Sequence, residues 1–276
     1  MRCVTVNVSA ASPFGDTSRR VRGMLAWASR VVSSLDRPSL VFAQECHDDW
    51  LRVWADAGYQ VILGDAEGQP QYKVRSAILA ERTLGLSRAE VEDVPTLAYH
   101  GSYIAAARWE VGNDRVLLMS VHASPNRAEK YLGDWPESAA GPVARAVERR
   151  PGGGNRLWNA DALLATLRHR ARLGPILAVG DFNEALGWDR THGGVSGRDY
   201  FDAVREAGLT SVLHDLWGLE ERATHRVNGK AGLQLDHIVA SPLLAVWISD
   251  PQVDAGWLAA LDHDDWSDHA PVWFSL

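Results

Sequence analysis

The sequence contains little cysteine, little lysine and no long apolar run. Its two cysteines, Cys3 and Cys46, do not imply a disulfide framework, so we expect buried free thiols. No apolar run approaches the roughly 18 residues of a membrane-spanning helix, and the opening stretch MRCVTVNVSA has no apolar signal-peptide core. These absences predict a cytoplasmic protein without a membrane partner.

A strong positive charge is also absent. The 276-residue chain has a formal net charge of −7, whereas a protein that binds DNA tightly and non-specifically normally carries a basic surface. An acidic enzyme still acts on phosphate groups when bound divalent cations supply the positive charge. The composition, 46% hydrophobic and 23% charged, is that of an ordinary globular protein, and we expect a single domain over residues 1–276.

Hydrophobic periodicity predicts more strands than helices. The predicted strands cover residues 2–10, 39–45, 59–64, 75–81, 102–111, 115–124, 175–183, 233–241, 244–253 and 270–276. The predicted helices cover residues 19–35, 48–59, 155–174 and 199–209; the third is capped by Asn155 or Asn159 and stopped by Gly174 and Pro175. Short turns between strands and a few covering helices indicate an α+β or α/β domain with a mainly antiparallel or mixed core.

Polar residues fall at the ends of six predicted strands. They are Asn7, Glu45, His122, Asp181 with Asn183, Asp236 with His237, and Asp268 with His269. Any one of them has a structural explanation, because Asp and Asn favour turns and a single histidine beside an apolar run is usually a hydrogen-bonded structural residue. Their recurrence at strand ends, where a rigid scaffold displays catalytic groups, indicates an active site.

The residue types at these positions agree on one chemistry. Glu45 and Asp268 are hard oxygen donors that suit Mg²⁺ or Mn²⁺, and the sequence has no Cys/His quartet for a structural zinc ion. Histidine is the residue type that ordinarily titrates near neutral pH, so His122 and His269 suit acid, base or oxyanion-stabilising roles. The set predicts metal-assisted attack of water on a phosphoester.

The stretch AVGDFNEA at residues 178–185 ends an apolar strand abruptly. Asp181 and Asn183 are two residues apart on a segment expected to be extended, so their side chains should point to the same side. A carboxylate and an amide placed together are able to position a water molecule and a phosphate oxygen.

The ordered motifs resemble those of one family. They are VNVSA, VFAQE, SVHASPN, GDFN, LDHIVAS and WSDHAPV, and they span essentially the whole chain, residues 4–276. This series resembles the endonuclease/exonuclease/phosphatase superfamily, which has the deoxyribonuclease-I-like fold. The resemblance implies an α+β, four-layer α/β/β/α architecture, in which a two-sheet β-sandwich is flanked by helices.

The resemblance also implies roles for the polar residues, with Mg²⁺ or Mn²⁺ as the cofactor. Glu45 looks like the principal metal ligand, with Asn7 and Asp268 close to the ion. Asp181 looks like the residue that aligns or deprotonates the water, and Asn183 like the amide that orients the phosphate. The remaining matches are His269, which contacts the phosphate and is held by Asp236, and His122, which stabilises the phosphate or protonates the leaving group.

His122 also bears on the branch of the family, because apurinic-site endonucleases usually have a tyrosine at that place. A basic or tyrosyl residue that touches the phosphate is expected between Glu45 and His122. Tyr72, Arg75 and Tyr103 are the candidates, and spacing does not choose among them. Residues 125–156 form a predicted long loop, read either as a substrate clamp or as a solvated basic loop.

Three functions stay open from the sequence. The first is a nuclease acting on DNA or RNA, because arginines supply most of the positive charge and suit bidentate phosphate contacts. The acidic net charge leaves a second, a phosphatase or phosphodiesterase that acts on a small phosphorylated molecule. The third, a catalytically silent binding module, is disfavoured because every expected site residue type is kept.

Overall fold

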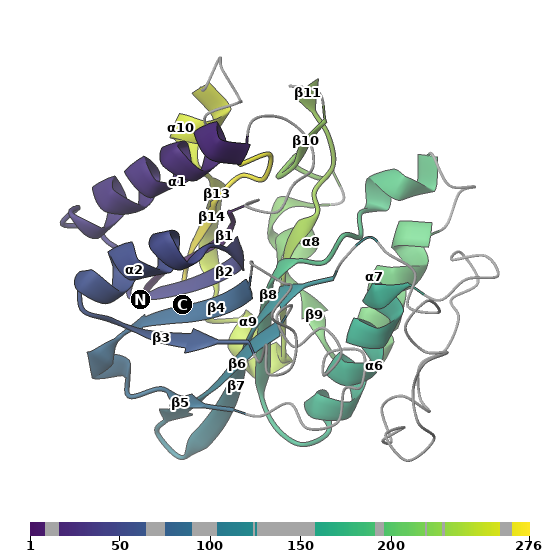
Figure 1. Ribbon diagram of the computed structural model, residues 1–276. Coiled ribbons are helices and arrows are strands. Elements are labelled where there is room, and N and C mark those ends of the chain that lie inside the picture. Colours follow the sequence, from purple (N-terminus) through teal and green to yellow (C-terminus); the bar gives the residue numbers. More distant parts are fainter. Residues whose placement is uncertain are drawn as a thin grey trace, which may run out of the picture.

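Two six-stranded sheets form the centre of the protein (Figure 1). The computed structural model describes residues 1–8, 17–64, 75–89, 104–123, 125, 158–190, 196–218, 220–227, 230–259 and 267–276. The first sheet has the order β13-β14-β1-β2-β4-β3. Its strands are β1 (Arg2–Asn7), β2 (Leu40–Cys46), β3 (Tyr59–Leu63), β4 (Arg75–Glu81), β13 (Ser249–Val253) and β14 (Val272–Ser275).

The second sheet has the order β5-β6-β7-β8-β12-β9. Its strands are β5 (Ser87–Arg88), β6 (Ile104–Val111), β7 (Asp114–His122), β8 (Ile176–Asp181), β9 (Thr210–Ser211) and β12 (Asp236–Ala240). A separate hairpin joins β10 (Arg226–Val227) to β11 (Lys230–Ala231). Each large sheet has one parallel pair, β1 with β2 and β7 with β8, and its other pairs are antiparallel. The predicted mixed core is therefore confirmed.

Helices cover the two outer faces of the sheets (Figure 1). The α-helices are α1 (Thr17–Val32), α2 (Asp48–Asp56), α6 (Asn159–Ala171), α7 (Ser196–Glu206), α8 (Val212–Trp217), α9 (Pro242–Ala245) and α10 (Ala255–Ala259), and the 3-10 helices are η1 (Arg82–Leu84) and η5 (Leu186–Arg190). Helices α1 and α2 lie over the first sheet, and α6 and α7 lie over the second. None of the helices in the described ranges is long and apolar enough to cross a membrane.

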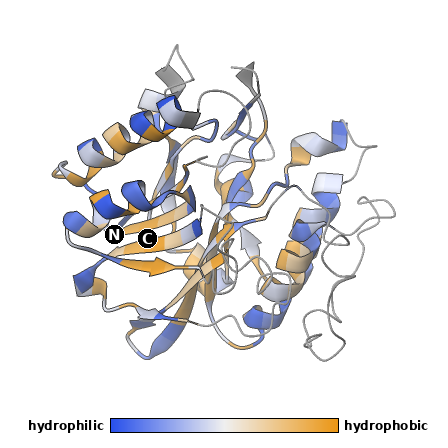
Figure 2. Cartoon of the chain, in the orientation of Figure 1, coloured by the Kyte–Doolittle hydropathy of each residue, from blue (hydrophilic) through white to orange (hydrophobic). Residues whose placement is uncertain are grey.

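Three apolar clusters hold these layers together, because each sheet buries both of its faces. Between the sheets, Phe42 and Ile78 from the first sheet pack with Leu118 and Leu177 from the second. The other two clusters join each sheet to its own helices, and Figure 2 shows the apolar residues concentrated along the strands and on the helix faces turned toward them. The expected four-layer α/β/β/α fold is confirmed, and both cysteines are free and buried.

The main correction concerns residues 244–253, which the sequence predicts as one strand. The segment begins within helix α9, and β13 starts only at Ser249. Ser241 is extended and Pro242 occupies the first turn, where its fixed φ angle favours a helix and its missing N–H costs no hydrogen bond. A smaller correction is at α6, whose N-cap is Trp158 rather than an asparagine.

The two sheets are tied together by polar groups below the site. Gln44 Nε2 on β2 donates a hydrogen bond to Ser120 Oγ on β7 at 2.8 Å, and that hydroxyl donates to the carbonyl of Ala43 at 2.9 Å. Gly180 makes this close approach possible: it has a φ of +142°, and a Cβ there would lie 2.2 Å from the Val121 carbonyl oxygen. The ends of β2, β7 and β8 are therefore fixed relative to one another.

Candidate active site

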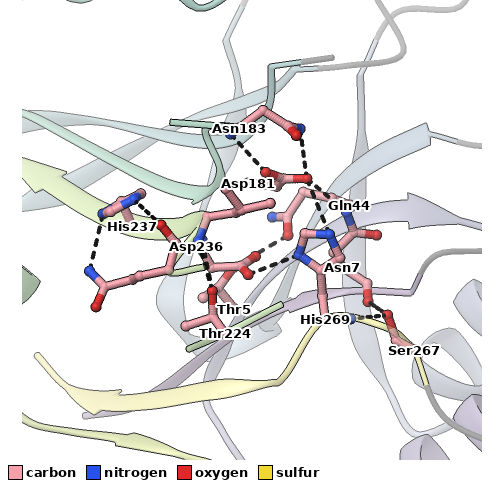
Figure 3. A network of polar contacts seen from close by, with 12 residues as sticks. Thr5, Asn7, Gln44, Asp181, Asn183, Thr224, Asp236, His237, Ser267 and His269 are labelled. Carbon is pink, nitrogen blue, oxygen red and sulfur yellow. Dashed lines mark hydrogen bonds and ion pairs between the residues drawn. The ribbon is translucent and has the colours of Figure 1, made fainter. Parts of the chain in front are cut away.

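Strand register places the polar residues at the ends of β7, β8 and β12 side by side. Asp181 at the end of β8 lies opposite His122 on the parallel strand β7 and opposite Asp236 on the antiparallel strand β12. Asn7 ends β1 in the other sheet and reaches across to Asp181 (Figure 3). Residues that are far apart in the sequence thus converge at one edge of the sandwich.

Asp181 is the centre of this cluster. Its Oδ1 accepts a hydrogen bond from the backbone nitrogen of Asn183 at 2.8 Å, and its Oδ2 accepts from Asn183 Nδ2 at 3.0 Å. Asn7 Nδ2 donates to the same Oδ2 at 3.1 Å. The Nε2 atoms of His122 and His269 each lie 3.7 Å from Asp181 Oδ2. The carboxylate is therefore held by amides on one side and faces two imidazoles on the other.

Two site residues have an unusual backbone. Glu45 and Asn183 both have a φ of +49°, in the left-handed region that non-glycine residues seldom occupy. Strain of this kind, of order 1–3 kcal/mol for each residue, persists only where the surrounding structure fixes it, and it clusters at active sites. The left-handed turn corrects the sequence argument for Asn183: the segment is not extended there, and Asn183 faces Asp181 because the chain turns back.

Glu45 lies where strand β2 loses its regular pairing. The register between β2 and β4 shifts between Ala43 and Cys46, so the strand bulges at Glu45 and redirects its side chain. Glu45 Oε1 accepts a hydrogen bond from Asn7 Nδ2 at 3.4 Å and lies 3.4 Å from His122 Nε2. Glu45 and Asn7 thus bring a carboxylate and an amide together beside Asp181.

The donor chemistry at Glu45 and Asn7 fits a divalent cation. Among the described residues, no group of three or more His, Cys, Asp or Glu side chains is arranged to hold a metal ion. Mg²⁺ does not need such a cage, because it usually binds through one or two carboxylates, several waters and the substrate phosphate. The Glu45 carboxylate supplies the hard oxygen that Mg²⁺ and Mn²⁺ prefer, and the amide group of Asn7 lies beside it.

His269 is paired with a buried carboxylate. Its Nδ1 donates to Asp236 Oδ2 at 2.9 Å, and the Asp236 side chain is fully buried. Burial by itself lowers the pKa of His269, but the carboxylates of Asp236 and Asp181 outweigh that effect and raise the pKa to about 10. His269 is therefore an imidazolium at neutral pH.

The pKa of Asp181 is raised, which is the direction expected for a proton acceptor. Burial raises the pKa of its carboxyl group to about 6, against the opposing effects of His269, His122 and the Asn183 backbone amide. A carboxylate with this pKa is ionised at neutral pH and is a stronger base than an ordinary aspartate.

The last motif, Ser267 to His269, contacts strand β1 and helix α1. Ser267 Oγ donates to the backbone carbonyl of Asn7 and accepts from the His269 backbone nitrogen at 3.1 Å, which docks this segment onto β1. Asp268 Oδ2 lies 3.5 Å from Arg20 Nη1 on α1. The expected neighbours of a metal-binding Asp268 are Glu45 and Asn7, whereas the ion pair described for it is with Arg20.

Of the three candidate phosphate-binding residues, only Arg75 lies within the described residues. It begins β4, pairs in register with Cys46 and lies 3.8 Å from Asp48 Oδ1 through Nη2. It is therefore at the same sheet edge as Glu45. Tyr72 and Tyr103 lie outside the described residues, as do residues 126–156 of the expected loop.

Sequence reasoning missed two supporting residues. Thr224 Oγ1 accepts hydrogen bonds from the backbone nitrogens of Leu235 and Asp236, both at 3.0 Å, and so fixes the start of β12. Arg20 is buried beside Asp268, although periodicity identifies it only as part of a helix. Neither residue belongs to a motif, and no local pattern marks them.

Comparisons with known proteins agree with this geometry. The family model described as "Endonuclease/Exonuclease/phosphatase family" matches residues 4–269. A 3′ phosphatase from Neisseria bound to a product DNA hairpin has a TM-score of 0.64 at 19% identity, covering 100% of this chain and 99% of that chain. An AP endonuclease from Archaeoglobus fulgidus has a TM-score of 0.61 at 16% identity with the same coverage. At such low sequence identities, the structural similarity shows a shared fold. A search of curated protein sequences finds no match.

Proposed function

Because the chain belongs to the endonuclease/exonuclease/phosphatase family of divalent-metal-dependent phosphoesterases, we propose that it is a nuclease. In this proposal it hydrolyses phosphodiester bonds by attack of a water molecule on phosphorus. The observation that carries the proposal is the setting of Asp181. A buried carboxylate with a raised pKa is held by Asn183 and Asn7 and faces the cationic His269.

The proposed reaction uses these groups in one step. Asp181 aligns the attacking water and accepts its proton while the water oxygen forms a bond to phosphorus and the ester P–O bond breaks. Asn183 orients a phosphate oxygen by donating a hydrogen bond. The His269 imidazolium stabilises the negative charge that develops on the phosphate, an effect that is strongest in a buried site. His122 donates a proton to the departing oxygen.

Asp236 and Glu45 support this step in different ways. Asp236 fixes the ring of His269 and keeps it protonated. Glu45, with Asn7, would hold Mg²⁺ or Mn²⁺; when bound, the cation neutralises charge on the phosphate and leaving oxygen. Asp268 is proposed to lie close to the same ion. Arg75, at the neighbouring strand end, is proposed to contact the phosphate.

The substrate class rests on the chemistry of the site and on two related structures. The Neisseria 3′ phosphatase was solved with a DNA hairpin, and another similar structure is a 3′-5′ exonuclease from Neisseria meningitidis, with 20% identity and a TM-score of 0.63 over 100% of this chain and 99% of that chain. These similarities make DNA the first substrate to test. The net charge of −7 favours a second candidate function, a phosphatase or phosphodiesterase for a small phosphorylated molecule.

One experiment separates these candidates. The purified protein is incubated with supercoiled plasmid, labelled single strands and a panel of phosphorylated metabolites, each with Mg²⁺, with Mn²⁺ or with EDTA. An Asp181→Asn variant is the control for a contaminating nuclease. Metal-dependent cleavage of nucleic acid that the variant lacks is expected. Release of phosphate from a metabolite with no nucleic-acid cleavage would replace the nuclease by the second candidate, and inactivity on both would overturn the proposal.

A further inference from the structure

The carboxylate of Glu221 binds the loop that follows Asp181. This loop, residues 182–187, follows β8, includes the first two residues of η5 and carries Asn183. Glu221 Oε1 accepts a hydrogen bond from the backbone nitrogen of Leu186 at 2.6 Å, and Oε2 accepts from that of Gly187 at 2.9 Å. One side chain from a distant part of the chain therefore fixes two consecutive amides at the end of the loop.

A buried histidine holds this carboxylate in place. His214 Nε2 on α8 donates to Glu221 Oε1 at 3.2 Å, and its Nδ1 accepts a hydrogen bond from Ser211 Oγ at 3.0 Å. The His214 ring packs edge-on against Phe201, with 4.3 Å between ring centroids. Burial raises the pKa of Glu221, but the hydrogen bonds from His214 and the two loop amides outweigh it and lower the pKa. Glu221 is therefore an anion matched to its three donors.

The Ser211, His214 and Glu221 side chains have the residue types of a hydrolase triad, but their arrangement supports a different role. Ser211 is 1% exposed, so its hydroxyl has no access to a substrate. Glu221 accepts a hydrogen bond from His214, as a triad acid would, but both of its oxygens also accept from backbone amides of the loop. The three residues therefore act on the loop.

His237 provides a second attachment, at the middle of the same loop. Its Nε2 donates to the backbone carbonyl of Glu184 at 2.8 Å and to that of Gln234 at 2.9 Å. The rings of His237 and His214 are neighbours, with centroids 5.2 Å apart, and Phe201 contacts both. The two attachments are thus parts of one buried cluster.

Asn183 lies between the Asp181 hydrogen bonds and these attachments. Its φ of +49° is a strained conformation that relaxes unless neighbouring contacts hold it. Asp181 fixes Asn183 from the strand side, and Glu184, Leu186 and Gly187 are fixed from the other side. Phe182, which is buried and donates through its backbone nitrogen to the Leu235 carbonyl at 2.9 Å, anchors the start of the same segment.

We propose that Glu221, held by His214, and His237 are positioning residues that keep Asn183 in its left-handed turn and aim its amide at the substrate. The proposal rests on the proposed function for its effect on turnover, because Asn183 is there the residue that orients the phosphate. Neither positioning residue contacts the substrate. Their effect should appear in kcat, since misplacing a reacting group by about 1 Å costs up to about a hundredfold in rate.

The primary test uses Glu221→Gln, which keeps the size of the side chain but sets an NH₂ group against one of the two loop amides. We expect kcat to fall between about tenfold and a hundredfold with KM little changed. In an Asn183→Ala background, the same substitution should cause no further loss, because both changes act through one group. The control is Tyr59→Phe on β3 of the other sheet, which removes a buried hydrogen bond to the Pro38 carbonyl and should leave kcat unchanged.

A second readout does not depend on activity. Amide hydrogen exchange at Asn183, Leu186 and Gly187 should be faster in Glu221→Gln than in the wild-type protein, and unchanged in Tyr59→Phe. His214→Gln, which retains a donor toward Glu221, should show a smaller effect on both kcat and exchange. It also serves as the test variant if Glu221→Gln does not fold.

The outcomes separate the two proposals. Wild-type protein that is inactive on every phosphoester, but whose loop amides are deprotected by Glu221→Gln, would overturn the function and keep the positioning role. Unchanged exchange at the loop amides would overturn the positioning role whatever the activity. Equal losses of kcat in the wild-type and Asn183→Ala backgrounds would also overturn it, because Glu221 would then act through another group.

Discussion

Asn183 contacts both oxygens of the Asp181 carboxylate, through its backbone nitrogen to Oδ1 and through its side-chain Nδ2 to Oδ2. The two residues form a closed local unit at the end of β8, and the left-handed turn at Asn183 allows it. One carboxylate is therefore fixed in both position and rotation before any substrate binds. Such preorganisation is the main source of electrostatic catalysis in enzymes.

The first prediction concerns Asp181. Replacing it by Asn keeps the shape but removes the proton acceptor, so we expect the rate of phosphoester hydrolysis to fall at least a hundredfold. The fold should survive, because burial of the charged carboxylate, which raises its pKa to about 6, is relieved. Steady-state turnover and thermal melting measure the two effects together. A variant that stays active but melts much earlier would make Asp181 a structural residue.

The second prediction concerns the metal. Glu45→Gln removes the negative charge of the proposed principal ligand while leaving an amide that accepts and donates hydrogen bonds. We expect the affinity for Mg²⁺ or Mn²⁺ to fall at least tenfold in calorimetric titration, because each cation prefers carboxylate oxygen. The matched control is Glu110→Gln on β6, whose carboxylate pairs with Arg115 at the surface. Equal affinities in the wild-type and Glu45→Gln proteins would exclude Glu45 as a ligand.

The third prediction concerns His269. Asp236→Asn removes the carboxylate that contributes most to raising the pKa of His269, so that pKa should move down from about 10. The imidazole resonances of the variant, followed by NMR as the pH is raised, measure the change. An unaltered titration of His269 would show that its other neighbouring carboxylates, Asp181 and Asp268, are enough to keep it protonated.

The fourth prediction concerns Gly180, where the sheets approach each other. A methyl group at this position would lie 2.2 Å from the Val121 carbonyl oxygen and 2.6 Å from Gln44 Nε2, so Gly180→Ala should lower the free energy of unfolding by more than about 2 kcal/mol. Gly208→Ala is the control, because Gly208 also has a positive φ but has nothing within 4 Å of the added carbon. Urea unfolding of both variants tests the difference, and equal losses would attribute the effect to backbone strain alone.

The fifth prediction is a pH dependence of stability. Burial, with the nearby His214, lowers the pKa of His237 to about 4, whereas an unfolded histidine titrates near 6.5. Below pH 6.5 the unfolded state therefore binds more protons at this residue, and the stability that neutral His237 permits is lost as the pH falls from about 6.5 to about 4.

The difference between wild-type protein and a His237→Gln variant isolates this effect, since other groups titrate in the same range. Urea unfolding at pH 7, 6 and 5 should give a steeper loss of stability for the wild type, reaching about 2 kcal/mol relative to the variant at pH 5. Parallel pH profiles would mean that His237 does not stay neutral in the folded protein.

Much of the fold was predictable because it depends on local patterns. Alternating and continuous apolar runs identified β1, β2, β4 and β8 with small errors at their ends. The pattern failed at residues 244–253, where an apolar run is shared between helix α9 and strand β13. Short apolar runs do not distinguish these two structures, and the extended Ser241 before Pro242 decided the outcome.

By itself, the sequence determined the residue types of the site and their order along the chain. It placed Asn7, Glu45, His122, Asp181 and His269 at or near strand ends, because each polar residue interrupts or ends an apolar run. It also supported the family membership, through motifs that the family model matches over residues 4–269.

Only the tertiary structure decided which of these groups meet and in what state. Sheet register sets Asp181 beside His122 and Asp236, and packing of the two sheets brings Asn7 and Glu45 to them. The left-handed turns, the raised pKa of Asp181 and the attachment of its loop by Glu221 depend on residues tens to hundreds of positions away. Such contacts arise from long-range packing and burial, which no local pattern of apolar and polar residues encodes.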